Sequence, residues 1–258
     1  MTEYALTLPT TDETKPIFLA GNLLELGTFG GDSESNLAAL KDRFLDTEWT
    51  SPGYLMVLGL VLSAPATATA IGIANHTFDG TTTISLSVSD DGGSTYTLVG
   101  TFLPTPEHTF LETFAPVTGT HWRIDIGGQA GLTIGYLAIG QAIDFERGIY
   151  AEVNPAPLAK DTTLMISEGS GGQYVGNRVI RERVSQSVRV DNLTSQWVRL
   201  YGGPLALALR DKSAFYGWRL AKYPLDVIYA WSEADAQMTN TGPKSLMDWS
   251  IDLRGIET

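Results

Sequence analysis

The sequence predicts a mainly β protein made of two β-sandwich domains, with one short helix near its start. Segments with strand-type patterns follow one another at short intervals, with turn residues between them, as is typical of sandwiches. The 27 glycines and 12 prolines suit a fold with many turns, and the 43% of hydrophobic residues can fill a core in each half. The length of 258 residues exceeds that of most single domains, which favours two.

Only one segment has apolar residues at clear helical spacing, and it lies before the first predicted strand. Leu37, Leu40 and Phe44 would share one face of a short helix, and Ser33 or Ser35 would cap its first turn.

The strand patterns of the first half begin at residue 54. Residues 54–62 form a continuous apolar run, which predicts a strand buried on both faces. Ile84, Leu86 and Val88 alternate with small polar residues and predict a half-buried strand. The Asp-Asp-Gly-Gly sequence that follows is typical of a hairpin turn. Further strands are expected at residues 67–74, 96–99, 121–126 and 132–139.

A second series of strands is expected beyond Phe145. Val184, Val188 and Val190 at even spacing predict a half-buried strand. Residues 206–211 fit either a short helical turn or a strand. The other strand candidates are residues 174–180, 196–201, 214–220, 227–231 and 250–253.

Charge is unevenly distributed along the chain. The net charge is −12, of which −11 falls on residues 1–143 and −1 on residues 144–258. This shift predicts a domain boundary near residue 145, with one domain at 1–145 and the second at 146–258. An acidic surface repels phosphate backbones, so we expect no binding of nucleic acid.

Neither a membrane anchor nor a secretion signal is expected. The first 14 residues lack the basic and apolar stretches of a signal peptide. The apolar run at 54–62 is too short to span a bilayer as a helix. The chain contains no cysteine, which excludes disulfides and thiolate metal sites. We therefore expect synthesis in the cytoplasm.

No recognisable catalytic constellation is present. His76, His108 and His121 are far apart and match no metal-ligand spacing. The motifs of hydrolases, zinc proteases and phosphate-binding loops are missing. We expect no catalytic residue, no cofactor and no metal, so the protein is predicted not to be an enzyme. A glycan-processing enzyme with a carboxylate pair stays an alternative, because Asp and Glu are plentiful.

The turn at residues 89–96 (SDDGGSTY) is a candidate ligand loop. It resembles the Asp-box of sialidases, which is a structural turn in those proteins. The alternatives are a hairpin turn in which an aspartate bonds to its own backbone, and a calcium site made by Asp90 and Asp91.

Arg178, Arg181, Arg183 and Arg189 form the basic cluster of the sequence. The last three have the same parity and would share one face of a strand. This pattern predicts a docking interface for an acidic partner, such as the first half of another copy of the chain. The alternative is a solvated outer face.

The first half resembles a discoidin domain of the coagulation factor 5/8 C-type. The resemblance is carried by the order of residues 46–51 (DTEWTS), 54–59 (YLMVLG), 87–96 (SVSDDGGSTY) and 114–124 (FAPVTGTHWRI). It implies a galactose-binding-like jelly roll, with Asp90, Asp91 and Trp49 as possible residues of a ligand loop. The chain departs from the family at Leu58, where an acidic residue is usual, and in lacking the terminal cysteines. Because ligand-binding loops vary most within such folds, the resemblance does not imply sugar binding.

The whole chain resembles minor tail and tail-tip proteins of long-tailed bacteriophages. The marks are residues 20–24 (AGNLL), 216–218 (YGW) followed by 223–231 (YPLDVIYAW), and 240–255 (NTGPKSLMDWSIDLRG). The resemblance implies a structural protein of the virion tail, a ring or adaptor made in the bacterial cytoplasm. Its partners would be other copies in a trimer or hexamer, and neighbouring tail-tube and tail-tip proteins. The alternative function is a carbohydrate-binding module for host-surface glycans.

Overall fold

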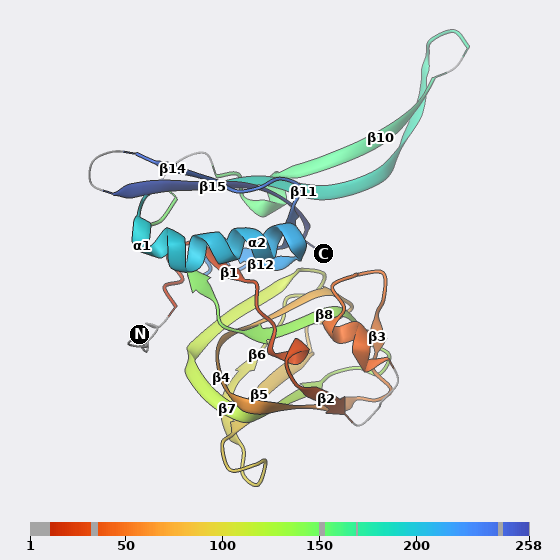
Figure 1. Cartoon of the computed structure of the whole chain (residues 1–258). Helices are drawn as coiled ribbons and strands as arrows, with labels where there is room; N and C mark the ends of the chain where they lie inside the picture. Colours follow the sequence, from red (N-terminus) through yellow and green to blue (C-terminus); the bar gives the residue numbers. More distant parts are fainter. Residues whose placement is uncertain (1–10, 32–35, 150–152, 169, 242–244, 258) are drawn as a thin grey trace.

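The computed structural model describes residues 11–31, 36–149, 153–168, 170–241 and 245–257. It contains two antiparallel sheets and little helix, which confirms the mainly β fold class (Figure 1). We refer to the part built around the first sheet as the sandwich unit and to the other part as the second unit.

The sandwich unit spans residues 20–142 and holds a seven-stranded sheet. The strand order is β3-β8-β4-β7-β5-β6, and β2 pairs with β4. The strands are β2 (Thr28–Gly31), β3 (Trp49–Thr50), β4 (Leu55–His76), β5 (Thr83–Ser89), β6 (Thr97–Phe102), β7 (Phe110–Gly127) and β8 (Thr133–Gly140). Two 3-10 helices, η1 (Leu23–Glu25) and η2 (Leu37–Lys41), lie between the first strands.

The second unit holds an eight-stranded sheet of order β10-β11-β15-β13-β12-β1-β9, with β14 paired to β15. Its strands are β1 (Ile17–Leu19), β9 (Ile143–Asp144), β10 (Lys160–Glu168), β11 (Tyr174–Thr194), β12 (Ala214–Gly217), β13 (Val227–Ser232), β14 (Gln237–Asn240) and β15 (Leu246–Ile256). A 3-10 helix, η3 (Ala156–Leu158), precedes β10. A continuous helix runs through α1 (Ser195–Trp197), the π-helical η4 (Val198–Gly202) and α2 (Gly203–Asp211).

The sandwich unit is inserted into the second sheet. Strand β1 precedes the sandwich unit and β9 follows it, and the two pair antiparallel with Phe18 opposite Ile143. Strand β1 also pairs with β12. The chain returns to the second sheet at β9. Residues 17–19, which precede the sandwich unit, also belong to the second sheet.

Strand β4 corrects one sequence prediction. Residues 54–62 are not buried on both faces, because Leu55 and Val61 are exposed while Met56, Leu58 and Leu60 are buried. The stretch buried on both faces lies further along the same strand, at residues 68–74. Its Ile71 and Ile73 pack into the sandwich core, while Ala70 and Ala74 pack against the second unit.

The alternating strands follow the predicted pattern. Ile84, Leu86 and Val88 of β5 are buried in the sandwich core together with Trp122 and Ile124 of β7. Strand β11 likewise buries Val184, Val188 and Val190. Alternation is informative for β11 because that strand has one face on a core and one on solvent over residues 184–190. In β5 the polar face is not open to solvent, since Ser87 and Ser89 are buried too.

The helix of the second unit contradicts a second sequence prediction. Residues 196–201, expected as a strand, belong to the helix that continues to Asp211. The Thr194 hydroxyl caps its start by accepting a hydrogen bond from Trp197 N at 3.2 Å. Leu205 and Leu209 then pack on the second sheet. The helix expected around Leu37 is only the 3-10 turn η2, and the proposed caps Ser33 and Ser35 lie outside the described residues.

An apolar layer joins the two units. It contains Ile17 and Leu19 of β1, Phe215 of β12, Val227 and Tyr229 of β13, and Ala70, Ala74, Leu111, Tyr136, Ala138 and Ala142 of the sandwich unit. Phe215 stacks on Tyr136 with ring centroids 5.8 Å apart, and Tyr229 lies 5.1 Å from Tyr136. No helix in the described part of the chain is long and apolar enough to cross a membrane.

Gly72 of β4 faces this layer, and we expect Gly72→Ala to destabilise the protein. A Cβ atom at residue 72 would lie 2.6 Å from Cδ2 of Phe215, inside van der Waals contact. Overpacking of this kind costs about 1–3 kcal/mol of the free energy of unfolding, measurable by urea denaturation. Gly53→Ala is the control, because no atom lies within 4 Å of its added Cβ. Equal stabilities of the two variants would contradict the expectation.

Candidate functional site

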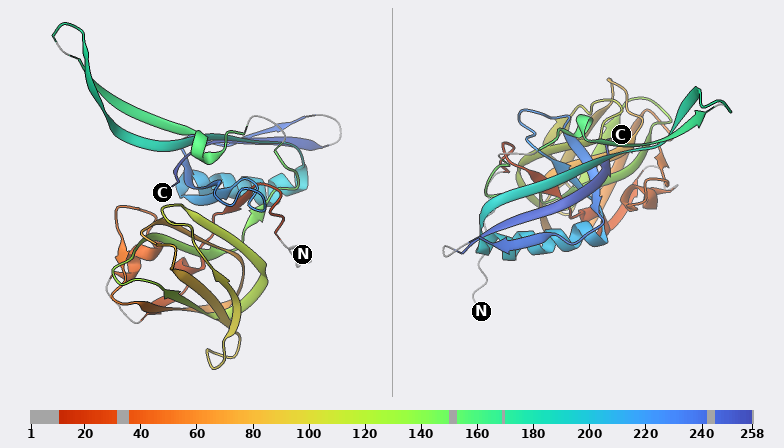
Figure 2. Two further views of the ribbon diagram at one scale, coloured as in Figure 1. Left: turned by 180° about the vertical axis from the view of Figure 1, so that it is seen from behind. Right: turned by 90° about the horizontal axis from the view of Figure 1, so that it is seen from above.

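The hairpin of β10 and β11 extends far beyond the body of the second unit (Figures 1 and 2). Strand β10 pairs only with β11, and β11 pairs with β15 only from Val184 onward. We call residues 160–168 and 170–183 the arm. Within the described residues, the arm has no sheet neighbour on either edge.

The arm exposes large hydrophobic side chains from both of its strands. Tyr174 and Val175 are 65% and 70% exposed, although each is the kind of residue that a strand normally buries. The full set is Leu164, Met165, Ile166, Tyr174, Val175, Val179 and Ile180. Exposed apolar side chains gathered on one element are a common feature of interaction sites.

The predicted arginines occupy two different settings. At the base of the arm, Arg183 pairs with Asp161 at 3.3 Å and with Glu233 at 3.7 Å, and Arg254 contacts the same two carboxylates. Arg189, nearer the body, pairs with Asp191 at 2.8 Å. These three arginines are engaged within the molecule.

Arg178 and Arg181 lie further out on the arm. Arg181 donates a hydrogen bond to the Thr163 hydroxyl at 3.4 Å. Arg178 is exposed and makes no ion pair with any residue that the structure describes. Of the predicted cluster, Arg178 is therefore the cation most available to a partner.

The turn at residues 89–96 is a self-contained structure. The Asp91 carboxylate accepts hydrogen bonds from Ser89 Oγ at 2.6 Å, from the backbone N–H groups of Ser94 and Thr95 at 2.9 Å, and from Thr95 Oγ1 at 2.6 Å. Its hydrogen-bonding capacity is used within the turn, as in the alternative of a structural Asx turn. These bonds, with that from Ser89 the largest cause, lower the pKa of Asp91.

The remaining residues of the predicted ligand loop do not join Asp91 in a site. Asp90 is exposed beside it. Trp49 is fully buried in the sandwich core, so its proposed place in a ligand loop is wrong: the ring fills the core between β8 and η2. Across the described residues, no group of three or more His, Asp or Glu gathers to hold a metal ion.

A cleft of about 830 Å³ opens where the two units meet. Its walls are mostly apolar and include Leu23, Leu26 and Ala66 of the sandwich unit and Trp197 and Tyr201 of the helix. Polar groups come from Lys15, Gln141, Asp144 and Glu146. Pockets of this kind, between about 300 and 1,000 Å³ with a few convergent polar groups, are typical binding sites.

Of the two carboxylates that line the cleft, Asp144 has the weaker hydrogen bonding. It is partly buried, and its one hydrogen bond within the described residues comes from Asp12 N at a long 3.4 Å. Burial raises the pKa of Asp144. By contrast, the Glu146 carboxylate accepts hydrogen bonds from Thr194 N and Thr194 Oγ1 at 2.8 and 2.7 Å.

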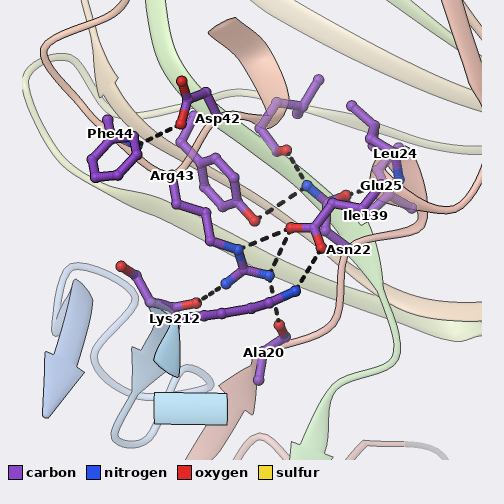
Figure 3. Close-up of polar contacts among 12 residues, drawn as sticks. Ala20, Asn22, Leu24, Glu25, Asp42, Arg43, Phe44, Ile139 and Lys212 are labelled. Carbon is purple, nitrogen blue, oxygen red and sulfur yellow. Dashed lines mark hydrogen bonds and ion pairs between the residues drawn. The ribbon is translucent and has the colours of Figure 1, made fainter. Parts of the chain in front are cut away.

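A polar network beside the cleft fixes its sandwich wall (Figure 3). Asn22 donates to the Leu137 carbonyl at 2.8 Å and accepts from Leu24 N at 3.0 Å, which holds η1 against β8. Arg43 pairs with Glu25 at 2.8 Å and donates to the backbone carbonyl of Ser213 in the second unit. Neither Asn22 nor Arg43 was identified from the sequence as a positioning residue.

Three aromatic rings are exposed in loops of the sandwich unit. Phe44 follows η2, Tyr54 precedes β4, and Tyr96 ends the turn after β5. Phe44 and Tyr54 are 71% and 74% exposed, and Tyr96 is 40% exposed. Exposed rings at loop tips are what the carbohydrate-binding alternative predicts.

Comparison with known proteins gives similar structures but no family. No family model and no curated protein matches the sequence. A module named CpGH89CBM32-6, produced by Clostridium perfringens, is 18% identical, with a TM-score of 0.40 over 46% of this chain and 98% of its own. A pectin-binding carbohydrate-binding module is 20% identical, with a TM-score of 0.36 over 43% and 88%. Chitosan-binding module 1 of a chitosanase/glucanase from Paenibacillus sp. IK-5 is 17% identical, with a TM-score of 0.38 over 46% and 98%.

The Asp91 turn yields a prediction about pH. Because the pKa of Asp91 is lower in the folded chain than its unfolded value, the ionised carboxylate stabilises the fold. We expect Asp91→Ala to lower the free energy of unfolding at pH 7. The difference from the native protein should shrink as the pH falls below about 4, where the unfolded carboxyl takes up a proton.

Urea denaturation between pH 3 and pH 7 measures this difference. Asp90→Ala is the matched control, since Asp90 is the exposed neighbour in the same turn. A loss of stability in Asp91→Ala that stays constant from pH 7 to pH 3 would show that the carboxylate charge plays no part.

Proposed function

We propose that this chain is a self-associating structural protein whose arm links one copy to another. The observation that carries the proposal is the arm itself, a two-stranded ribbon with exposed hydrophobic side chains on both strands and no sheet neighbour among the described residues. An isolated hairpin is at best marginally stable in water. Its free edges and apolar side chains favour association.

Within this proposal, the finer role is that of a ring or adaptor subunit in the tail tip of a long-tailed bacteriophage. The resemblance of residues 20–24, 216–218, 223–231 and 240–255 to tail-tip proteins supports it. Such a role places the protein in the virion after assembly in the bacterial cytoplasm, next to tail-tube and tip proteins. It requires binding and assembly only, and no catalysis.

Glycan binding by the sandwich unit is a second candidate function. The exposed rings of Phe44, Tyr54 and Tyr96 support it, because aromatic rings at loop tips offer flat apolar faces to ligands. The two functions are compatible, since a tail protein can carry a sugar-binding module. The pectin-binding and chitosan-binding modules named above make these polysaccharides and host-surface glycans the ligands to screen first.

The assembly proposal predicts a discrete oligomer that depends on the arm. Light scattering over a concentration series should give a multiple of 27.9 kDa for the native chain, with three or six copies expected for a ring. Val175→Asp with Val179→Asp should reduce the mass to that of a monomer, because the interface would then bury two carboxylates.

The control for this measurement is Leu103→Asp, which places the same charge on a side chain of the sandwich unit that is 70% exposed, like Val175. We expect this variant to keep the native mass. A monomeric native chain at every concentration would contradict self-association, and an unchanged mass in the double variant would exclude the arm.

The glycan candidate predicts that Tyr54→Ala weakens binding about tenfold, the equivalent of about 1.4 kcal/mol, if its ring stacks on a sugar. Titration calorimetry measures the affinity. Leu55→Ala is the control because Leu55 is the adjacent exposed side chain and has no ring. If the native chain gives no heat of binding with any glycan tested, glycan binding is contradicted.

A further inference from the structure

The arm and the junction cleft lie at opposite ends of the second unit. In Figure 1 the arm ends far to the upper right, whereas α1, which carries Trp197 of the cleft, lies at the left end. The view from behind in Figure 2 shows the same separation. The arm therefore points away from the cleft of its own molecule, so an arm that filled a cleft would have to belong to another copy.

The chemistry of the two surfaces is complementary. The cleft is a mostly apolar recess lined by Leu23, Leu26 and the rings of Trp197 and Tyr201. The end of the arm presents exposed Val175 and other large apolar side chains. Burial of apolar surface on both sides stabilises association.

The charges match as well. Asp144 of the cleft is a partly buried carboxylate with one long hydrogen bond, from Asp12 N. Burial raises the pKa of this group, and the nearby charge of Lys15 offsets the shift in part. Lys15, the cation that lines the cleft, pairs with Asp12 at 2.9 Å. Arg178 on the arm is an exposed guanidinium without an ion pair in the described structure.

We propose that the end of the arm of one copy inserts into the junction cleft of a second copy, with its apolar side chains against Trp197 and Tyr201 and Arg178 near Asp144. The proposal rests on the self-association put forward above and names the surface that receives the arm. An interface between two different surfaces of identical chains is head-to-tail. Such an interface adds copies until the rotation closes a ring.

Complementation between two defective variants tests this arrangement. The arm-defective variant is Val175→Asp with Val179→Asp. The cleft-defective variant is Leu26→Lys with Asp144→Asn, which puts a cation at the rim and removes the carboxylate charge. Each variant alone should be monomeric, at 27.9 kDa by light scattering. A 1:1 mixture should give a dimer of twice that mass, because one intact arm meets one intact cleft.

Leu103→Lys is the matched control for the cleft variant, because Leu103 and Leu26 are each 70% exposed and Leu103 does not line the cleft. It should assemble like the native chain. An oligomeric native protein whose cleft-defective variant also assembles fully would overturn the cleft as the receiving surface. A monomeric native protein would instead overturn the self-association on which this inference rests.

Thiol cross-linking provides a second measurement that does not require either surface to be disabled. The chain has no cysteine, so introduced thiols react without background. Val175→Cys combined with Thr67→Cys, which lies in the cleft wall, should give covalent oligomers with a short bis-maleimide. Val175→Cys combined with Leu103→Cys should not.

Three other outcomes of the cross-linking are decisive against the proposal. Cross-linking of Val175→Cys alone would mean that two arms pair with each other. If Val175→Cys cross-links to Leu103→Cys as efficiently as to Thr67→Cys, the arm has no defined binding site. Absence of covalent product in a protein that light scattering shows to be oligomeric would place the arm elsewhere.

Discussion

The contact between Phe215 and the sandwich unit sets the geometry of the whole molecule. Its ring lies against Gly72 of β4 and stacks on Tyr136 of β8, in a layer from which water is excluded. Interiors of this density deform little. Because the layer fixes the second sheet on the sandwich, it also fixes the walls of the cleft and the direction in which the arm leaves the body.

Sequence patterns predicted the strands that have one face on a core, and they were less informative elsewhere. The alternation at Ile84, Leu86 and Val88 identified β5 because its other face carries small polar residues, although Ser87 and Ser89 on that face are buried as well. The small residues at 68–74 gave no hint that a second unit covers them. The helix at 195–211 was predicted only in part, because residues 196–201 were interpreted as a strand and residues 206–211 as either a helical turn or a strand.

The candidate site could be predicted only in part. The arginines of β11 were identified as an interface, but Arg183 is paired with Asp161 and Glu233, which are distant in sequence, and Arg189 is paired with the nearby Asp191. Trp49 was misassigned because exposure cannot be read from a residue type. The arm contains short apolar runs, Val179-Ile180 and Leu164-Met165-Ile166, of the kind that a sheet usually buries, yet these side chains are exposed. The mismatch became visible only in three dimensions.

The insertion of the sandwich unit has an engineering consequence. The chain leaves the second sheet after Leu19 and returns at Ile143, and these ends are neighbours because Phe18 pairs with Ile143. The intervening segment is therefore a cassette whose two ends meet, the arrangement in which domain insertion is tolerated. A short turn could replace residues 20–142, provided that Phe215 and Tyr229 were made polar. Evolution could exchange the cassette by the same route while keeping the arm and its sheet unchanged.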